Sequence, residues 1–217
     1  GIVSVASGEG LSEIFRSLGC DVVVNGGQSM NPSTEDFLRA FEKINADSIF
    51  VFPNNGNILM AAKQAAELYD KAQVLVVPSK TVGEGYAAIS MLDPSEGDAQ
   101  AVFDTLCEII SGVVTGTVSR ASRETTKDGV CVHAGDYIGF VGDHIYLDVE
   151  SRNAAAEQLA EKLGAEHYDI LLLICGCDTS PEERSNLQRT LQQKYRRTEV
   201  IMLDGGQPVY DYILVLE

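Results

Sequence analysis

Short apolar runs alternate with helix-spaced segments through the first hundred residues, and this alternation limits the possible folds more than any other feature. The runs lie at residues 2–6, 22–24, 48–52 and 74–77. After the first run, Leu11, Phe15 and Leu18 recur at the spacing of one helical face. Parallel strands need crossover connections, which are usually helices, and a sheet covered on both faces is built from continuously apolar strands. The pattern therefore predicts a parallel sheet with helices on both faces.

Capping signals predict where several helices begin. Ser33-Thr34-Glu35-Asp36 and Ser180-Pro181-Glu182-Glu183 each offer a side-chain oxygen followed three residues later by an acid. Asp93-Pro94-Ser95-Glu96 also offers a capping oxygen, with proline at the first helical position, and leads into a helix over 101–110. Two further helical segments are expected at 58–69 and 154–163.

The pattern changes after Gly112. Short β-branched or aromatic runs, separated by polar turns that contain glycine, predict antiparallel strands at 113–119, 130–133, 137–141 and 144–148. Further strands are expected at 170–174, 200–203 and 212–216. The predicted fold is α/β with two subdomains: residues 1–112 with a Rossmann-like parallel sheet, and residues 113–217 with a mixed sheet and helices.

The net charge restricts the classes of partner. The chain has 16 basic and 32 acidic residues, a net charge of −16, which disfavours binding to nucleic acid or to anionic lipid surfaces. No apolar run reaches the roughly 18 residues that span a bilayer, so no membrane insertion is expected. The acidity fits either a solubility role or a negative docking face for a basic partner.

Five cysteines, an odd number in mostly apolar settings, are typical of reduced thiols and indicate a cytoplasmic protein. The chain begins on Gly1 with a strand-like run, from which we expect a fragment of a longer protein.

Motif spacing argues against the common catalytic and cofactor sites. Gly8-Glu9-Gly10 resembles the start of a dinucleotide fingerprint, but Glu13 occupies the position of the third glycine and Asn25 that of the expected acid. Lys80-Thr81 lacks the glycines of a phosphate loop. We therefore predict no bound cofactor.

The cysteines and histidines likewise predict neither a metal site nor catalytic residues. Cys175-Gly-Cys177 has one intervening residue where a redox motif has two, and zinc needs three or four ligands. Cys131, His133 and His144 could converge, but placement in strands explains them more simply.

Two glycine turns occupy equivalent places in the two halves. Asn25-Gly26-Gly27-Gln28 and Asp204-Gly205-Gly206-Gln207 each follow a strand. They are either plain turns or the lining of a crevice at the carboxyl ends of the strands, where open α/β sheets bind ligands. The stretch from Gly26 to Asp36 concentrates hydroxyl and amide groups before a helix N-terminus, a place suited to a carboxylate or phosphate.

At this loop the sequence resembles the C-terminal part of the kinase subunit of bacterial fatty acid kinase, in the dihydroxyacetone-kinase-like family. The similarity runs through Gly8-Glu9-Gly10-Leu11, Gly26–Asp36, Phe52–Asn55, Val77–Thr81, and Gly205–Pro208 with Tyr210. It implies a DegV-like fold of two α/β subdomains around a crevice. It also implies that ATP and magnesium belong to an N-terminal domain elsewhere in the parent kinase chain, and that a DegV-type fatty-acid-binding protein is the partner.

The resemblance also indicates which residues would face that crevice. In DegV-type proteins, hydroxyls on the loop at 28–34, a Ser-Gly-Thr turn after the next strand and a C-terminal histidine hold a fatty acid carboxylate. This chain keeps Ser33 and Thr34, but has Asn54-Asn55-Gly56 and Gly205-Gly206-Gln207 at the other two places. The candidate crevice residues are Gln28, Ser29, Asn31, Ser33, Thr34, Asn54, Asn55, Lys80, Gly205, Gly206, Gln207 and Tyr210.

Three functional hypotheses follow. The first is a non-catalytic domain that docks the acyl-carrying protein through an acidic surface and so supports fatty acid phosphorylation for phospholipid synthesis. The second is a lipid or small-molecule binder that uses Ser33, Thr34, Asn54 and Gln207. The third is an independent enzyme that uses Cys175, Cys177 and a histidine.

Overall fold

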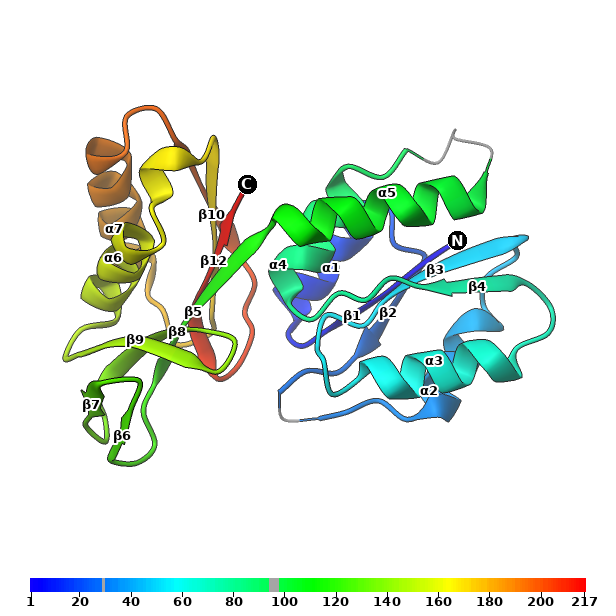
Figure 1. Ribbon diagram of the computed structural model, residues 1–217, viewed down its shortest axis with the longest axis horizontal. Coiled ribbons are helices and arrows are strands. Elements are labelled where there is room, and N and C mark those ends of the chain that lie inside the picture. The colour runs from blue at the N-terminus through cyan, green and yellow to red at the C-terminus, as the bar shows by residue number, and fades with distance from the viewer. Residues whose placement is uncertain (29, 94–97) are drawn as a thin grey trace. The chain divides into compact units, whose positions relative to one another are not determined.

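The computed structural model describes residues 1–28, 30–93 and 98–217, and the chain forms two compact units, Gly1–Val113 and Val114–Glu217 (Figure 1). Each unit has its own sheet and its own hydrophobic core. Within the described ranges, none of the helices combines the length and the apolar character needed to cross a bilayer.

Unit 1, as we call Gly1–Val113, is built on a four-stranded parallel sheet. Its strands are β1 (Ile2–Ala6), β2 (Val22–Asn25), β3 (Ser48–Phe52) and β4 (Gln73–Val76), in the order β2-β1-β3-β4. The predicted parallel sheet is confirmed. All four strands end at the same edge, so the loops that follow them share that edge.

Helices cover both faces of this sheet. They are α1 (Glu9–Ser17), α2 (Thr34–Phe41), α3 (Leu59–Leu68), α4 (Val82–Ser90) and α5 (Ala99–Gly112). The helices α2 and α3 lie against one face, while α1 and α4 lie on the other side with α5 packed on α4 (Figure 1). One core is formed between α2, α3 and the sheet by Val3, Val5, Val24, Phe37, Phe41, Ile49, Val51, Ile58, Ala62 and Ala65.

The observed helix starts show which sequence signals were sufficient. Ser33 caps α2 in a capping box with Asp36, as predicted. Helix α5 begins at Ala99 with Asp98 as its N-cap, and the expected start over 94–96 lies outside the described residues. Helix α4 was not predicted, because its two glycines, at 83 and 85, weaken the helical pattern.

Unit 2, as we call Val114–Glu217, contains a six-stranded mixed sheet. Its strands are β5 (Val114–Arg120), β8 (Tyr137–Val141), β9 (His144–Val149), β10 (Ile170–Cys175), β11 (Glu199–Asp204) and β12 (Tyr210–Leu216). The order is β11-β10-β12-β5-β8-β9, and β10–β11 is the parallel pair. The mixed second sheet is therefore also confirmed.

Two helices cover one face of this sheet, α6 (Arg152–Lys162) and α7 (Pro181–Lys194), and a short 3₁₀ helix spans Ala165–His167 (Figure 1). The core between them contains Ala155, Ala156, Leu159, Leu171, Leu173, Leu187, Leu191, Tyr212, Leu214 and Leu216. Ser180 and Glu183 form the predicted capping box at the start of α7.

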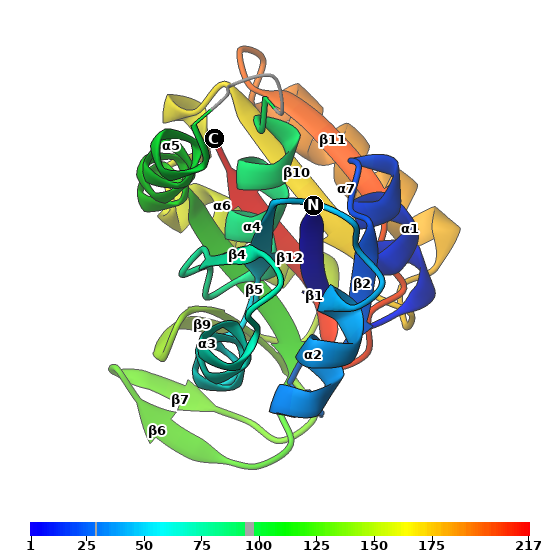
Figure 2. The ribbon, with the colours of Figure 1, turned by 90° about the vertical axis from the view of Figure 1, so that its right-hand side faces the viewer.

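A separate hairpin of β6 (Thr125–Lys127) and β7 (Val130–Val132) extends from unit 2 beside β9 (Figures 1 and 2). Asp128 and Gly129 form its turn with φ angles of 55° and 80°, as a two-residue type I′ turn requires. The sequence predicted β7 but not β6, whose three exposed polar residues carry no apolar alternation.

Candidate functional site

At the carboxyl edge of the unit 1 sheet, the side chain of Asn54 is saturated with internal hydrogen bonds. Asn54 is buried and has a left-handed backbone, with φ at 57°. Its Nδ2 donates to Ser4 Oγ and to the Val5 carbonyl, each at 2.9 Å, while Ser79 Oγ donates to its Oδ1 at 2.9 Å. Its own backbone N–H donates to Ser79 Oγ at 3.1 Å. Asn54 thus ties β1 to the loops that follow β3 and β4.

Gly85 in helix α4 makes room for this amide. A Cβ atom at position 85 would lie 1.9 Å from Asn54 Oδ1, well inside van der Waals contact. The glycine that hid α4 from sequence analysis is therefore required by the packing of Asn54.

The hydroxyls of the loop before α2 are also engaged. Ser33 Oγ donates to the Asp36 carboxylate at 2.7 Å, and Thr34 Oγ1 donates to Gln64 Oε1 at 2.9 Å. The hydrogen bonds from the Ser33 side chain and backbone lower the pKa of Asp36. Both hydroxyls organise α2 and its contact with α3.

The remaining candidates of unit 1 are spread along the same edge. Gln28 and Asn31 are exposed, and Ser29 lies outside the described residues. Asn31 helps to line a cavity of about 430 Å³ between β2 and α2. Asn55 is buried and its Oδ1 accepts the Asn57 N–H at 2.9 Å.

Lys80 has an exposed side chain, and its backbone N–H donates to the Glu84 carboxylate at 2.5 Å. Burial raises the pKa of Glu84, against these backbone hydrogen bonds, which lower it. Within unit 1 the structure brings Asn54 together with Ser79, whereas Ser33 and Thr34 bond instead to residues of α2 and α3.

At the corresponding edge of unit 2, Gln207 fills the space after β10 and β11. It is 3% exposed, and its Nε2 donates to the carbonyls of Ile174 at 3.1 Å and Tyr210 at 3.3 Å. The N–H groups of Gly205 and Gly206 both donate to the Cys175 carbonyl at 3.0 Å. A Cβ at Gly205 would lie 2.1 Å from Gln207 Oε1, so the turn closes tightly over the amide. Gln207 Oε1 is buried and has no partner among the described residues.

The backbone just after Gln207 adopts an uncommon conformation. Val209 has φ at 73°, and the N–H of Tyr210 donates to the Pro208 carbonyl at 2.8 Å, which makes a γ-turn. A β-branched residue with positive φ is rare because its side chain crowds the backbone. The Tyr210 ring packs edge-on against Phe140 with centroids 6.0 Å apart.

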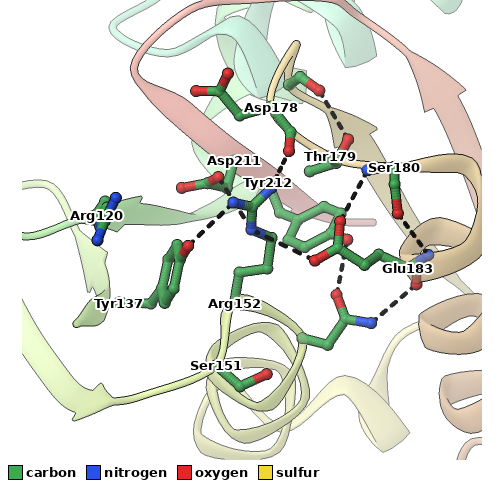
Figure 3. A network of polar contacts seen from close by, with 12 residues as sticks. Arg120, Tyr137, Ser151, Arg152, Asp178, Thr179, Ser180, Glu183, Asp211 and Tyr212 are labelled. Atoms are coloured by element: carbon green, nitrogen blue, oxygen red, sulfur yellow. Dashed lines mark hydrogen bonds and ion pairs between the residues drawn. The ribbon is translucent and has the colours of Figure 1, made fainter. Parts of the chain in front are cut away.

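A network of charged groups surrounds Arg152, at the first turn of α6 (Figure 3). Its guanidinium donates to the Asp178 carbonyl and, at 3.0 Å, to the Tyr137 hydroxyl. Its Nε lies 3.4 Å from Asp211 Oδ1 and 3.8 Å from Glu183 Oε1. Because two carboxylates already face it, Arg152 is a link between α6, α7 and β12 rather than an anion site.

Asp211, 6% exposed at the start of β12, is the most buried acid of this network. Burial raises the pKa of its carboxyl, against the nearby Arg152 charge, which lowers it. Sequence analysis did not select Asp211 or Arg152. The available signal was a single acid within the apolar run from Tyr210 to Leu216.

The cysteine pair of unit 2 does not form a metal or redox centre in the described part of the chain. Cys175 is buried and burial raises the pKa of its thiol to about 11, while Cys177 is exposed. Within the ranges that the structure describes, neither belongs to a group of side chains close enough to share one ion. Such a group is formed there by His133, Asp136 and Asp148.

Comparison with known proteins places the chain in a family. The family model for the C-terminal region of FakA-like fatty acid kinase proteins matches residues 1–217, and the chain belongs to this family. It is 41% identical over 217 residues to protein YloV of Bacillus subtilis (strain 168), and 33% identical over 220 residues to an uncharacterised protein of Staphylococcus aureus (strain USA300). All of the chain is covered in both cases, but it spans only 39% of each relative's length.

Solved structures confirm the DegV-like fold. A DegV family protein of Corynebacterium glutamicum matches with a TM-score of 0.70 and 14% identity, covering 99% of this chain and 96% of that one. The dihydroxyacetone kinase of C. freundii matches at 0.69 and 15%, covering 99% and 47%. The Fak B3 protein of Streptococcus pneumoniae, solved with linoleic acid, matches at 0.62 and 14%, covering 86% and 76%. At these identities the likeness concerns the fold.

Proposed function

We propose that the chain is the non-catalytic C-terminal domain of a fatty acid kinase, and that it docks an acyl-carrying, DegV-type fatty-acid-binding protein through its acidic surface. The ATP-binding domain then lies elsewhere in the parent kinase chain. Docking raises the local concentration of the acyl group near that domain and so supports fatty acid phosphorylation for phospholipid synthesis.

The observation that carries this proposal is the internal use of the crevice donors. Ser33 and Thr34 each donate a hydroxyl hydrogen within unit 1, and both amide hydrogens of Asn54 are donated there as well. Gln207 Nε2 donates to two carbonyls of unit 2. A fatty acid carboxylate needs hydrogen-bond donors to replace water, and each of these would have to break an existing bond to supply one. A fatty acid carried by a partner avoids this cost.

The charge supports docking by electrostatic attraction. Since the chain has 32 acidic and 16 basic residues, at least half of its carboxylates have no cation of their own. An excess of one sign accelerates association with an oppositely charged partner and makes binding depend on salt. The five cysteines, all of them free thiols, are consistent with a cytoplasmic location for this complex.

Analytical ultracentrifugation of the chain with a DegV-type fatty-acid-binding protein tests the proposal. We expect a complex at about 20 mM salt that weakens at least tenfold at about 500 mM, because exposed charges are screened beyond roughly 4 Å at the higher salt. Absence of a complex at low salt, with both proteins near 100 μM, would refute docking. A complex of equal strength at both salt concentrations would refute the acidic-surface part.

A second candidate function is direct binding of a lipid or other small molecule. The unpartnered Oε1 of Gln207 favours it, because a buried acceptor gains from a ligand hydroxyl. Native mass spectrometry of the chain with added oleic acid decides this candidate. A one-to-one adduct that Gln207→Leu abolishes supports it, and no adduct at a tenfold ligand excess rules it out.

A further inference from the structure

Unit 2 gathers one histidine and two aspartates where the β6–β7 hairpin meets the six-stranded sheet. His133 follows β7, Asp136 precedes β8 and Asp148 lies on β9. His133 Nδ1 is 2.7 Å from Asp148 Oδ2 and 3.9 Å from Asp136 Oδ2. One ligand atom from each residue lies within 4.8 Å of the other two. These groups are close enough to share a single ion.

The backbone holds these side chains in place. The Asp136 N–H donates to the His133 carbonyl at 3.2 Å, which closes a turn with Gly135 at φ 96°. Ala121 fixes the same turn, because its N–H donates to the Asp136 carbonyl and its own carbonyl accepts from Gly135. The His133 N–H donates to Asp148 Oδ2 at 3.2 Å. The site is therefore anchored on two strands and one rigid turn.

The carboxylate of Asp148 is the observation that points to a ligand. Its side chain is only 4% exposed, and its Oδ1 is buried without a hydrogen-bond partner among the described residues. A buried carboxylate is costly unless a cation or several hydrogen bonds compensate its charge. The pair with His133 satisfies one oxygen and leaves the other unpaired. Glu124 and Asp136 add further negative potential around His133.

We propose that His133, Asp136 and Asp148 bind a divalent transition-metal ion of the zinc type. An imidazole nitrogen with two carboxylate oxygens is a ligand set that suits zinc better than magnesium, and three protein ligands leave the fourth position for water. Tetrahedral ligands lie about 3.3 Å apart at zinc bond lengths, between the two distances from His133 Nδ1. Rotation of the exposed imidazole toward Asp136 would even out these distances. The ion would pin the hairpin to β9.

Calorimetric titration of the 217-residue chain with zinc chloride, under reducing conditions after chelator treatment, tests this site. We expect one site, with affinity lowered at least tenfold by His133→Gln and by Asp148→Asn. Since Asp148→Asn alters a buried group, the exposed His133→Gln is the deciding variant. His144→Gln is the matched control, because His144 pairs with Asp128 at 3.4 Å but has no second carboxylate within reach in the described residues.

Thiol binding is separated by Cys131→Ser, which removes the exposed cysteine of the same hairpin and should leave zinc affinity unchanged within twofold. In hydrogen exchange, zinc should slow the amides of 125–132 at least tenfold in the wild type and not in His133→Gln. Absence of zinc binding at about 1 mM, wild-type affinity in His133→Gln, or loss of the site in Cys131→Ser would each overturn the proposal.

Discussion

Replacing Asn54 tests how the carboxyl edge of unit 1 is held together. Asn54→Gly keeps a residue that adopts positive φ freely, but removes the hydrogen bonds to Ser4, Val5 and Ser79. Each buried group left without its partner costs about 1 kcal/mol or more, so we expect a loss of roughly 3 kcal/mol of unfolding free energy. Asn54→Ala adds the left-handed backbone cost of about 1–2 kcal/mol and should lose about 4–5 kcal/mol.

Urea unfolding followed by circular dichroism measures both variants, with an unchanged m-value as the sign that unfolding remains comparable. The exposed Asn57→Ala serves as a control and should stay within about 0.5 kcal/mol of wild type. A loss below about 1 kcal/mol for Asn54→Gly would refute the hydrogen-bond reasoning. Equal losses for the glycine and alanine variants would refute the backbone reasoning.

Three further predictions concern packing, thiol reactivity and pH. Gly85→Ala should destabilise the chain by more than about 2 kcal/mol despite the better helix propensity of alanine, and Asn54→Gly should recover most of that loss in a double-mutant cycle measured by urea unfolding. In a thiol-labelling assay at pH 8, exposed Cys177 should react at least a hundredfold faster than Cys175, whose buried thiol has a pKa of about 11; equal rates would contradict this. Burial raises the pKa of Asp211, so its contribution to stability is present below its unfolded value near 3.8 and is lost as pH rises through the folded value; urea unfolding from pH 4 to 7 should show wild type losing stability relative to Asp211→Asn, and parallel curves would oppose the assignment.

Local sequence signals predicted much of the fold because they act over a few residues. The capping boxes at Ser33 and Ser180 placed α2 and α7 correctly, since each needs only a hydroxyl and an acid three residues later. Helix α4 was missed because Gly85 lowers helix propensity for a tertiary reason, the bulk of Asn54. That reason cannot be read from neighbouring residues.

The site was harder to predict because its chemistry depends on where donors are directed. Ser33, Thr34 and Gln207 have the residue types of a ligand site, but their hydrogens are donated to Asp36, Gln64 and main-chain carbonyls. The cluster of His133, Asp136 and Asp148 was also missed. Asp148 reaches His133 across β7 and β9, a pairing that no spacing rule in the sequence indicates.

The Asn54 network also bears on the order in which unit 1 folds. Its hydrogen bonds join residues separated by 50, 49 and 25 positions along the chain. Closing such long loops carries an entropic cost that must be met before these bonds can form. The amide can reach all three partners only after β1, β3 and the segment following β4 are aligned, so the network is a late contact whose loss accelerates unfolding more than it slows folding.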